Sequence, residues 1–166
     1  MFTTKSGRSI SYYGREYTSD IQRDIQRKDG KSHLICSADQ LFFILLNVWC
    51  RDTAYPSCQK DYECENDPTY GQCAITATLV YDIYDMFGGT ICKIRVNGGG
   101  THYFNKINDH YIDLTRNQFD LYHIPVEYDD NVSVLREYCG KNADTQKRYQ
   151  LLVCLISDWI SEHKTD

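Results

Sequence analysis

The sequence predicts an α+β domain in which a central helix packs against a small antiparallel β-sheet, with further helices at its flanks. Apolar residues recur at helical spacing after Cys73, and Gly88-Gly89 ends that segment. Three shorter segments follow, with apolar residues in alternation and only short turns between them, which is typical of an antiparallel meander. The predicted helix spans residues 73–87, and the predicted strands span 90–96, 101–107 and 110–115.

The size and composition of the chain are those of one ordinary soluble globular domain, with 166 residues, 42% hydrophobic and 25% charged. We expect a single domain over residues 1–166, in which a polar, mildly basic and mobile arm (1–32) precedes the body (33–166). The net charge of −5 gives no reason to expect a nucleic acid or an anionic membrane as partner.

The beginning of the sequence lacks the apolar segment of a signal peptide, and no segment approaches the roughly 20 apolar residues of a membrane span. We therefore expect a cytoplasmic protein, unless a signal-independent route exports it. Its eight cysteines are then expected to be thiols rather than a disulfide scaffold. Cys50, Cys58 and Cys64 are spaced unlike the ligands of structural zinc sites, so no metal or other cofactor is predicted.

The region before the central helix contains one further core helix. Ser37 and Gln40 form the pattern of a capping box, and residues 38–50 after them are apolar nearly all round. Upstream, we predict a strand at 9–13 and a short helix at 19–28. Residues 51–70 have few apolar side chains, and because a loop of this length tends to be functional, we expect it to form a lid or wall of the site.

The region after the sheet is predicted to be helical. A short helix is expected at 132–139, and Asn142 or Asp144 caps a last helix that extends through 150–163. The buried stripe of that last helix consists of Leu152, Leu155, Ile156, Trp159 and Ile160.

Cys73 has the sequence context of a thiol nucleophile. A helix N-terminus and a neighbouring imidazolium both favour the thiolate form of a cysteine, and Cys73 stands where the predicted helix begins. The first N–H groups of a helix have no intrahelical partner, so the Cys73 amide, with Gln72 beside it, is a candidate donor to an oxyanion.

His102 and Asp113 are the candidate base and its orienting acid. His102 opens a strand directly after three glycines, and the Asn108-Asp109 turn folds the next strand back so that Asp113 lies nearly opposite His102. Asp113 would then accept from one ring nitrogen and leave the other for Cys73. His110 is the competing histidine, and its position at a turn predicts an exposed side chain that points away from the helix start.

Each of these residues also has a structural interpretation. A cysteine among apolar residues is commonly part of a core, a single strand histidine is more often structural than catalytic, and an aspartate before Leu-Thr often caps a turn. Their order along the chain and their convergence at one edge of helix and sheet favour the catalytic interpretation.

Several segments between Trp49 and Phe119 carry a family resemblance: Trp49 with Asp52-Thr53-Ala54, Gly71-Gln72-Cys73-Ala74-Ile75-Thr76-Ala77, Gly88-Gly89, His102-Tyr103-Phe104-Asn105, and Asp113-Leu114-Thr115-Arg116-Asn117-Gln118-Phe119. This stretch resembles the YunG family of small bacterial proteins. The later Arg148-Tyr149 with Leu151-Leu152 is also similar, and together these segments cover about half of the chain, in order. The family looks like a compact relative of papain-like and transglutaminase-like cysteine enzymes, which share the order Cys, His, Asp. The resemblance implies a papain-like fold, with Gln72, Trp49 and Asn105 as candidate oxyanion or substrate residues.

The sequence thus predicts a cysteine hydrolase or acyl transferase that acts on an amide or thioester, most simply of a protein or peptide, through a thioester at Cys73. Peptidase, isopeptidase, deamidase and acyltransferase chemistry all remain open, because they share this half-reaction. Two alternatives stand beside it. One is a binding protein with a vestigial triad, and the other is a metal module built from Cys50, Cys58, Cys64 and a histidine.

Overall fold

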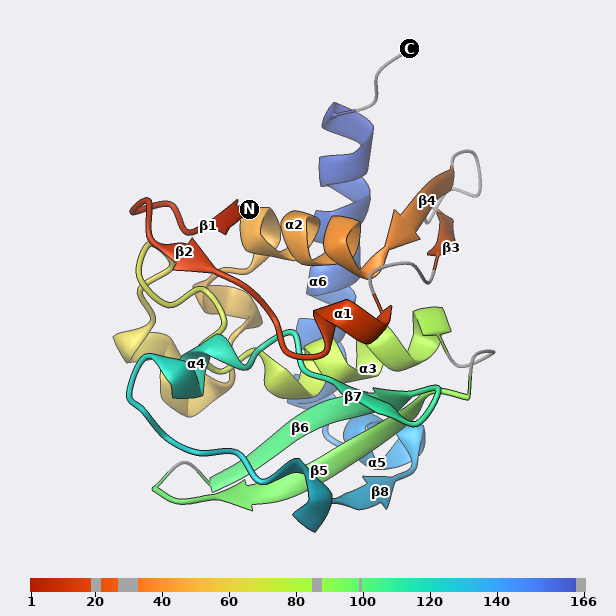
Figure 1. The fold of residues 1–166 in the computed structure, drawn as a ribbon. Helices are drawn as coiled ribbons and strands as arrows, with labels where there is room; N and C mark the ends of the chain where they lie inside the picture. The colour runs from red at the N-terminus through yellow and green to blue at the C-terminus, as the bar shows by residue number, and fades with distance from the viewer. Residues whose placement is uncertain (19–21, 27–32, 85–87, 99, 164–166) are drawn as a thin grey trace.

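Three layers of secondary structure make up the fold, with α3 in the middle layer (Figure 1). A computed structural model describes residues 1–18, 22–26, 33–84, 88–98 and 100–163. A four-stranded antiparallel sheet forms one layer, α3 (Cys73–Tyr84) crosses it, and α2 (Ala38–Val48) and α6 (Ala143–Glu162) lie on the other side of α3. The predicted α+β class with a helix on a small antiparallel sheet is confirmed.

The sheet contains the predicted meander and one further strand. Its order is β7-β6-β5-β8, and all neighbours are antiparallel. The strands are β5 (Thr90–Val96), β6 (Gly100–Ile107), β7 (His110–Ile112) and β8 (Val132–Val134). β7 is short and pairs with β6 only from Asn105 to Ile107, so the first half of β6 is left without a strand on that side.

The turn between β6 and β7 is the tight turn that the sequence predicts. Asn108 and Asp109 both have left-handed backbones, with φ of 50° and 63°. Two successive residues of this kind suit the twist of a two-residue hairpin, and Asn and Asp tolerate the conformation better than most residues. The turn therefore sets the register that places residues 110–113 beside the body of β6.

Capping residues set the starts of α2 and α6. Ser37 accepts from the Gln40 amide and the Gln40 side chain accepts from the Ser37 amide, so the predicted capping box of α2 is confirmed. Asn142, rather than Asp144, is the N-cap of α6, where it accepts from the amides of Asp144 and Thr145.

The main core lies between α2, α3 and α6. Apolar side chains from all three helices form one buried cluster, which also receives Ile107, Ile112 and Leu114 from the sheet and the chain after it. A second cluster contains Cys92, Ile94, Val96, Phe104, Phe119, Val126 and Tyr128, from β5, β6 and the segment after the meander. Phe104 is thus the contribution of β6 to this second cluster.

The predicted helix at 19–28 is wrong within the described residues, because residues 22–26 form β3. This strand pairs with β4 (His33–Ser37) in a two-stranded antiparallel sheet, in the register Gln22↔Ser37 to Gln26↔His33. Helices of about ten residues are marginal in water without a packed face, and two isoleucines are too few to provide one. A partner strand later in the chain decides the structure instead. The remainder of the predicted helix lies outside the described residues.

The predicted helix at 132–139 is correct only in its second half. Residues 132–134 form β8 on the free edge of β5, and α5 (Arg136–Gly140) follows. The Val-Ser-Val segment has β-branched residues in alternation, and the unpaired edge of β5 offers it hydrogen bonds.

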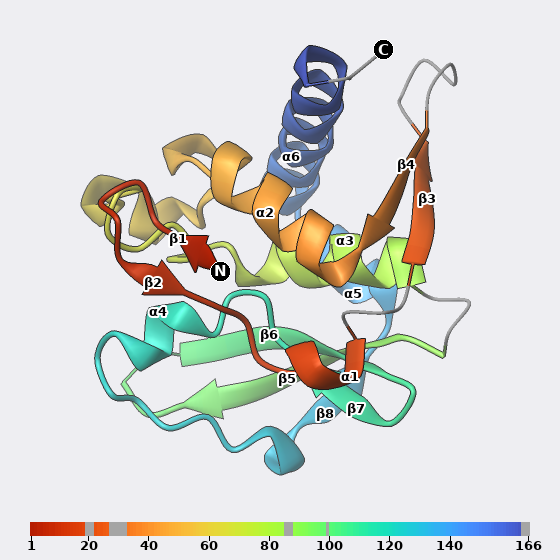
Figure 2. The same ribbon diagram turned by 45° about the horizontal axis from the view of Figure 1, so that its top comes forward.

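Residues 1–18 pack on the body and do not form a separate arm. The segment contains β1 (Phe2–Thr3), β2 (Ser9–Ile10) and α1 (Arg15–Thr18), and it runs along α2 toward the sheet (Figure 2). Ile10 and Tyr12 belong to the main core. The Tyr12 hydroxyl donates to Asp39 at 2.6 Å, and Arg15 forms an ion pair with the same carboxylate.

The loop at 51–70 contains two 3₁₀ helices, η1 (Arg51–Thr53) and η2 (Pro56–Asp61). Thr53, Ala54, Tyr62 and Thr69 are buried, and the Tyr62 hydroxyl donates to the Pro68 carbonyl. The loop therefore contributes to the core as well as to the surface. No helix among the described residues combines the length and the apolar character needed to cross a membrane.

Candidate active site

Cys73 is the first residue of α3, as the sequence predicts. Its side chain is partly exposed. Within the described residues, the Cys73 amide N–H donates to no main-chain carbonyl, whereas the amide of Gln72 donates to Thr69. The N-terminus of a twelve-residue helix is an electropositive place with free donors. Cys73 thus lies at the electropositive end of a helix, with an amide that can receive negative charge.

His102 lies near the beginning of β6 and is buried, with 1% of its surface exposed. Its Nε2 atom lies 2.7 Å from Oδ2 of Asp113. The ring stacks on Phe104, with a centroid distance of 5.9 Å, and meets the edge of Phe119 at 4.6 Å. Hydrogen bond and aromatic packing together fix the orientation of the imidazole.

Asp113 is fully enclosed directly after β7. The register of β6 and β7 puts it diagonal to His102 rather than directly opposite, and both side chains lie on one face. Four donors satisfy the carboxylate: Oδ2 accepts from His102 and from the Tyr128 hydroxyl, each at 2.7 Å, and Oδ1 accepts from the amide and hydroxyl of Thr115. The Asp113 main chain also pairs with Tyr13 in both directions.

The electrostatics of the pair favour the charged forms of both residues. Burial raises the pKa of Asp113, but His102, Tyr128 and the Thr115 amide together lower it below its ordinary value. Burial lowers the pKa of His102, but the Asp113 charge and hydrogen bond, with a smaller contribution from Cys73, raise it above its ordinary value. An imidazolium beside Cys73 is the expected state of His102 near neutral pH.

The second ring nitrogen of His102 is the atom available to Cys73. Nδ1 is buried and has no hydrogen-bond partner in the described structure, because Nε2 is the atom bound to Asp113. The Cys73 side chain is close enough to the ring to raise the pKa of His102. The structure therefore brings Cys73, His102 and Asp113 together in the predicted order.

The other three predicted site residues have packing roles. Trp49 is 1% exposed and its indole N–H donates to the hydroxyl of Thr76, one turn into α3. The Asn105 amide group donates to the carbonyls of Ala77 and Thr90, and so ties α3 and β5 to β6.

Gln72 is also inside the protein. Its surface is 0% exposed, and its Nε2 donates to the Cys50 carbonyl at 3.0 Å. Its carboxamide therefore connects the loop to the start of α3 and does not face solvent. The Cys73 amide remains as the candidate oxyanion donor.

His110 is exposed, as predicted, and does not take part in the site. Its ring stacks on Tyr17 of α1 at a centroid distance of 4.0 Å. This contact joins the N-terminal segment to β7, on the outside of the protein.

Sequence reasoning missed two residues that complete the site, Thr115 and Tyr128. Thr115 was within reach of sequence analysis, because an aspartate often accepts from the amide two residues later. Tyr128 lies fifteen residues from Asp113 in a segment without periodicity, and only the fold brings its hydroxyl to the carboxylate.

The cysteines of the loop before α3 contact neighbouring parts of the chain. The side chain of Cys58 lies against Gly71, and Cys64 donates to the Trp49 carbonyl at 3.5 Å. Among the described residues, no group of three or more His, Cys, Asp or Glu side chains is placed to hold a metal ion.

This geometry suits thiol chemistry. It provides a partly exposed thiol at a helix N-terminus, an imidazole with one free nitrogen, and a buried carboxylate that orients the imidazole.

Comparison with known proteins gives one family. No curated protein and no solved structure matches the chain. The family model described as YunG protein matches residues 37–160, which include Cys73, His102 and Asp113. This match spans most of the sequence, so the chain belongs to the YunG family.

Proposed function

We propose that the protein is a cysteine-dependent hydrolase or acyl transferase that acts on an amide or thioester bond. One observation carries the proposal: the buried His102–Asp113 pair leaves Nδ1 of His102 without a partner beside the thiol of Cys73. A buried polar atom without a partner costs free energy, and such an atom next to a potential nucleophile is more readily understood as catalytic than as structural.

The first half-reaction would begin with the thiolate of Cys73 and the imidazolium of His102. The Cys73 sulfur attacks the carbonyl carbon of the substrate, and the oxygen becomes an oxyanion that the Cys73 amide can receive. When the tetrahedral intermediate collapses, the bond to the leaving group breaks. His102 gives its Nδ1 proton to that leaving group, which departs as an amine or a thiol, and a thioester at Cys73 remains.

The second half-reaction would release the acyl group. Nδ1 of His102 takes a proton from water, or from an acceptor amine, as that nucleophile attacks the thioester. The Cys73 sulfur leaves as a thiolate, and the imidazolium is restored. Asp113 keeps the ring oriented and stabilises its positive charge throughout, without itself being protonated.

The arrangement supports a papain-like interpretation of the fold. A thiol at the N-terminus of a central helix, followed along the chain by a histidine on one strand and an acid after the next strand, is the order of papain-like and transglutaminase-like enzymes. Because unrelated folds reach the same constellation, this likeness is an analogy about chemistry and not about descent.

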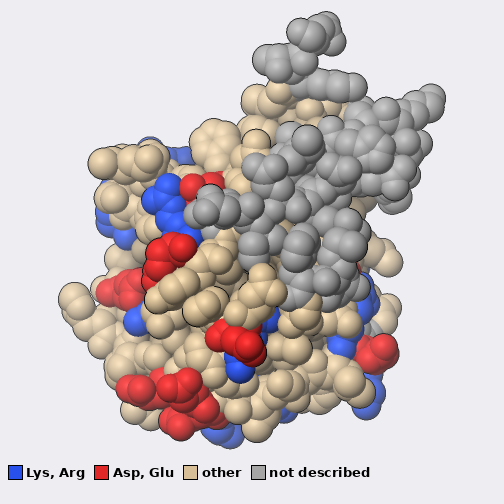
Figure 3. Space-filling view, turned by 45° about the vertical axis from the view of Figure 1, so that its right-hand side comes forward, with Lys and Arg blue, Asp and Glu red and all other residues tan. Residues whose placement is uncertain are grey.

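A protein or peptide is the proposed substrate class. On the face that Figure 3 shows, the described acidic and basic side chains are interspersed among neutral ones, and the largest group of one sign is acidic. A nucleic acid would require a basic surface. The net charge of −5 agrees with this reasoning.

Alkylation by iodoacetamide tests the proposal. Cys73 should react faster than the other cysteines in the folded protein between pH 6 and 7.5, as measured by mass spectrometry of each cysteine peptide. His102→Ala should slow the alkylation of Cys73 roughly tenfold or more at pH 6–7, because the thiolate loses its partner. Asp113→Asn should slow it less, because the ring remains in place.

His110→Ala is the control, since that side chain is an exposed histidine outside the site. Equal alkylation profiles for the wild type and a folded His102→Ala variant would rule out the triad. Preferential reaction of Cys50 or Cys58, with Cys73 unlabelled, would also contradict the proposal.

A further inference from the structure

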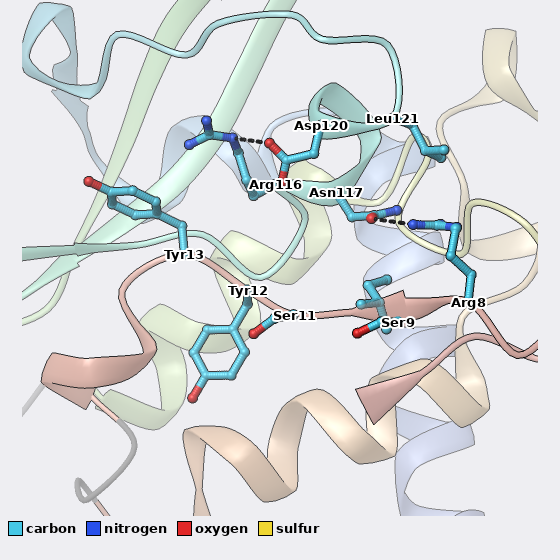
Figure 4. Close-up of a pocket in the computed structure, with 10 residues that line it drawn as sticks. Arg8, Ser9, Ser11, Tyr12, Tyr13, Arg116, Asn117, Asp120 and Leu121 are labelled. Carbon is cyan, nitrogen blue, oxygen red and sulfur yellow. Dashed lines mark hydrogen bonds and ion pairs between the residues drawn. The ribbon is translucent and has the colours of Figure 1, made fainter. Parts of the chain in front are cut away.

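A groove of about 560 Å³ lies between the N-terminal segment and α4 (Asn117–Asp120), as Figure 4 shows. Residues 8–13 form one wall and residues 116–121 form part of the other. Cys73 and His102 do not line it, so the groove is separate from the candidate active site. Tyr13, which pairs with Asp113 through its main chain, is among the residues that line it.

One wall of the groove is an unpaired main-chain edge. On its other side, β2 pairs with β1, and the Thr4 amide donates to the Arg8 carbonyl. Alternate residues of an extended chain point their main-chain groups to opposite sides, so those of Ser9 point away from β1. Tyr13 uses that same outer side to pair with Asp113.

Ser11 lies between Ser9 and Tyr13, and its main-chain groups are on the unpaired side of this segment. Its N–H and C=O have no main-chain partner within the described residues, and its exposed hydroxyl has no hydrogen bond there. The edge is open because the chain after Asp113 turns away into α4 instead of continuing along β2.

The charges around the groove favour an acidic occupant. Arg8 and Arg116 line it, against one carboxylate, Asp120, which Arg116 already binds at 2.9 Å. Arg8 donates to the Asn117 side chain and to the Asn66 carbonyl. A guanidinium has five N–H donors, so Arg8 retains donors for a further acceptor. The lining side chains carry one net positive charge, and Asp67, a further carboxyl that interacts with Arg8, is buried and has a raised pKa because of that burial.

We infer that this groove binds an extended peptide segment of a partner protein, which adds as a strand to the edge of residues 9–11 and places an acidic side chain near Arg8. An added strand satisfies main-chain donors and acceptors on both chains, and this is a common mode of peptide recognition. The inference does not depend on the chemistry at Cys73.

A peptide library provides the test. The probes are blocked hexapeptides that carry one glutamate among randomised residues, selected on the immobilised full-length protein and then measured by fluorescence anisotropy. At least one selected peptide should bind the wild type with a micromolar Kd. Cys73→Ser should bind it equally, and replacement of its glutamate by glutamine should weaken binding several-fold.

Two substitutions at Ser11 distinguish main-chain pairing from side-chain contact. Ser11→Pro removes the N–H that the guest strand would use, but no internal hydrogen bond, and proline is tolerated on strand edges. It should raise the Kd about tenfold, which is the effect of one lost hydrogen bond of ordinary strength. Ser11→Ala removes the hydroxyl alone and should change the Kd by less than about twofold.

Two outcomes would overturn the inference: no hexapeptide binds the folded wild type, or the selected peptides bind Ser11→Pro as tightly as the wild type. If Ser11→Pro fails to fold, N-methylation of the peptide replaces it. Methylation at alternate residues should abolish binding in the strand-addition mode, and methylation at the intervening residues should not. Equal effects at all positions would exclude an added strand.

Discussion

At the scale of single residues, the carboxylate of Asp113 determines the state of the site. A buried carboxyl group is normally neutral, yet donors from His102, Tyr128 and Thr115 surround both of its oxygens. The resulting negative charge keeps the neighbouring imidazole protonated. In the proposed reaction, the reactivity of Cys73 would therefore depend on groups that do not touch the substrate.

Tyr128→Phe tests this dependence. The substitution removes a hydroxyl that donates to Asp113 and keeps the ring that packs on Phe104. It should lower the free energy of unfolding by about 1–3 kcal/mol and slow Cys73 alkylation at pH 6–7, because the pKa of Asp113 rises. Tyr111→Phe is the matched control, since its hydroxyl accepts from Asn131 and does not reach Asp113. Identical alkylation profiles for Tyr128→Phe and the wild type would show that the hydroxyl is not needed.

The pair also predicts a pH dependence of stability. The pKa of His102 is raised in the folded protein, so its contribution is complete below the unfolded value, about 6.5, and is lost as the pH rises toward the folded value. The pKa of Asp113 is lowered, so its contribution is complete above the unfolded value, about 3.9, and is lost as the pH falls.

The stability advantage of the wild type over His102→Gln should therefore shrink above pH 6.5, by up to about 1.4 kcal/mol per pH unit. Urea unfolding at pH 6, 7, 8 and 9 measures it. A difference that stays constant over this range would mean that His102 has the same pKa in the folded and the unfolded protein.

At the scale of secondary-structure elements, the start of α3 is fixed by close packing against the loop before it. Gly71 has φ of +72°, and a Cβ atom there would lie 2.8 Å from Cβ of Cys58. The Gly71 carbonyl accepts from Tyr55, and its amide donates to Gln118. The loop thus holds the main chain two residues before Cys73.

Gly71→Ala and Gly88→Ala separate packing from backbone strain. Both glycines have φ of +72°, but a Cβ at Gly88 would meet nothing within 4 Å. Gly88→Ala should cost about 1 kcal/mol of stability through the backbone alone, and Gly71→Ala should cost at least about 1 kcal/mol more because Cys58 must move. Thermal unfolding measures both variants. Equal losses of stability in the two variants would show that Cys58 moves away from the new Cβ atom at no cost.

The elements predicted correctly from the sequence are those that local signals define. The capping box of Ser37 and the Asn108-Asp109 turn act within a few residues, so α2 and the hairpin of β6 and β7 could be predicted. β3 and β8 could not, because each forms only where a strand elsewhere in the chain offers an edge. A short segment with few apolar residues follows its partner more than its own propensity.

The same division applies to the site. The order of Cys73, His102 and Asp113, with one tight turn between the last two, was enough to bring these residues together. Trp49 and Asn105 were instead proposed as substrate residues from resemblance alone, and in the structure both make internal hydrogen bonds. A sequence thus indicates which side chains are able to react. It gives less information about the hydrogen bonds that those side chains make inside the fold.

At the scale of the whole molecule, the N-terminal segment is part of the structure that holds the site. Gly14 has φ of +88°, and a Cβ atom there would overlap the main-chain oxygen of Tyr111 in β7. One residue earlier, Tyr13 pairs with Asp113, and its ring packs on Tyr128 at a centroid distance of 4.5 Å. The close packing of Gly14 on Tyr111 is thus adjacent, along the chain, to the pairing of Tyr13 with Asp113.

Gly14→Ala should weaken both the docking of this segment and the site. We expect a loss of more than about 2 kcal/mol in stability and slower alkylation of Cys73 at pH 6–7. Gly7→Ala is the control, because Gly7 has a similar φ of +87° but nothing within 4 Å of its Cβ position, so it should leave alkylation unchanged. A Gly14→Ala variant with wild-type alkylation would show that the segment does not act on Asp113.

The pairing of Tyr13 with Asp113 means that part of the support of the candidate site lies outside the region that matches the family. The YunG match covers residues 37–160, whereas Tyr13 lies upstream of it. The main chain of Asp113 is thus supported by a segment outside the matched region. Displacement of this segment should therefore change the reactivity of Cys73 in the proposed reaction, although no residue of the segment belongs to the proposed triad.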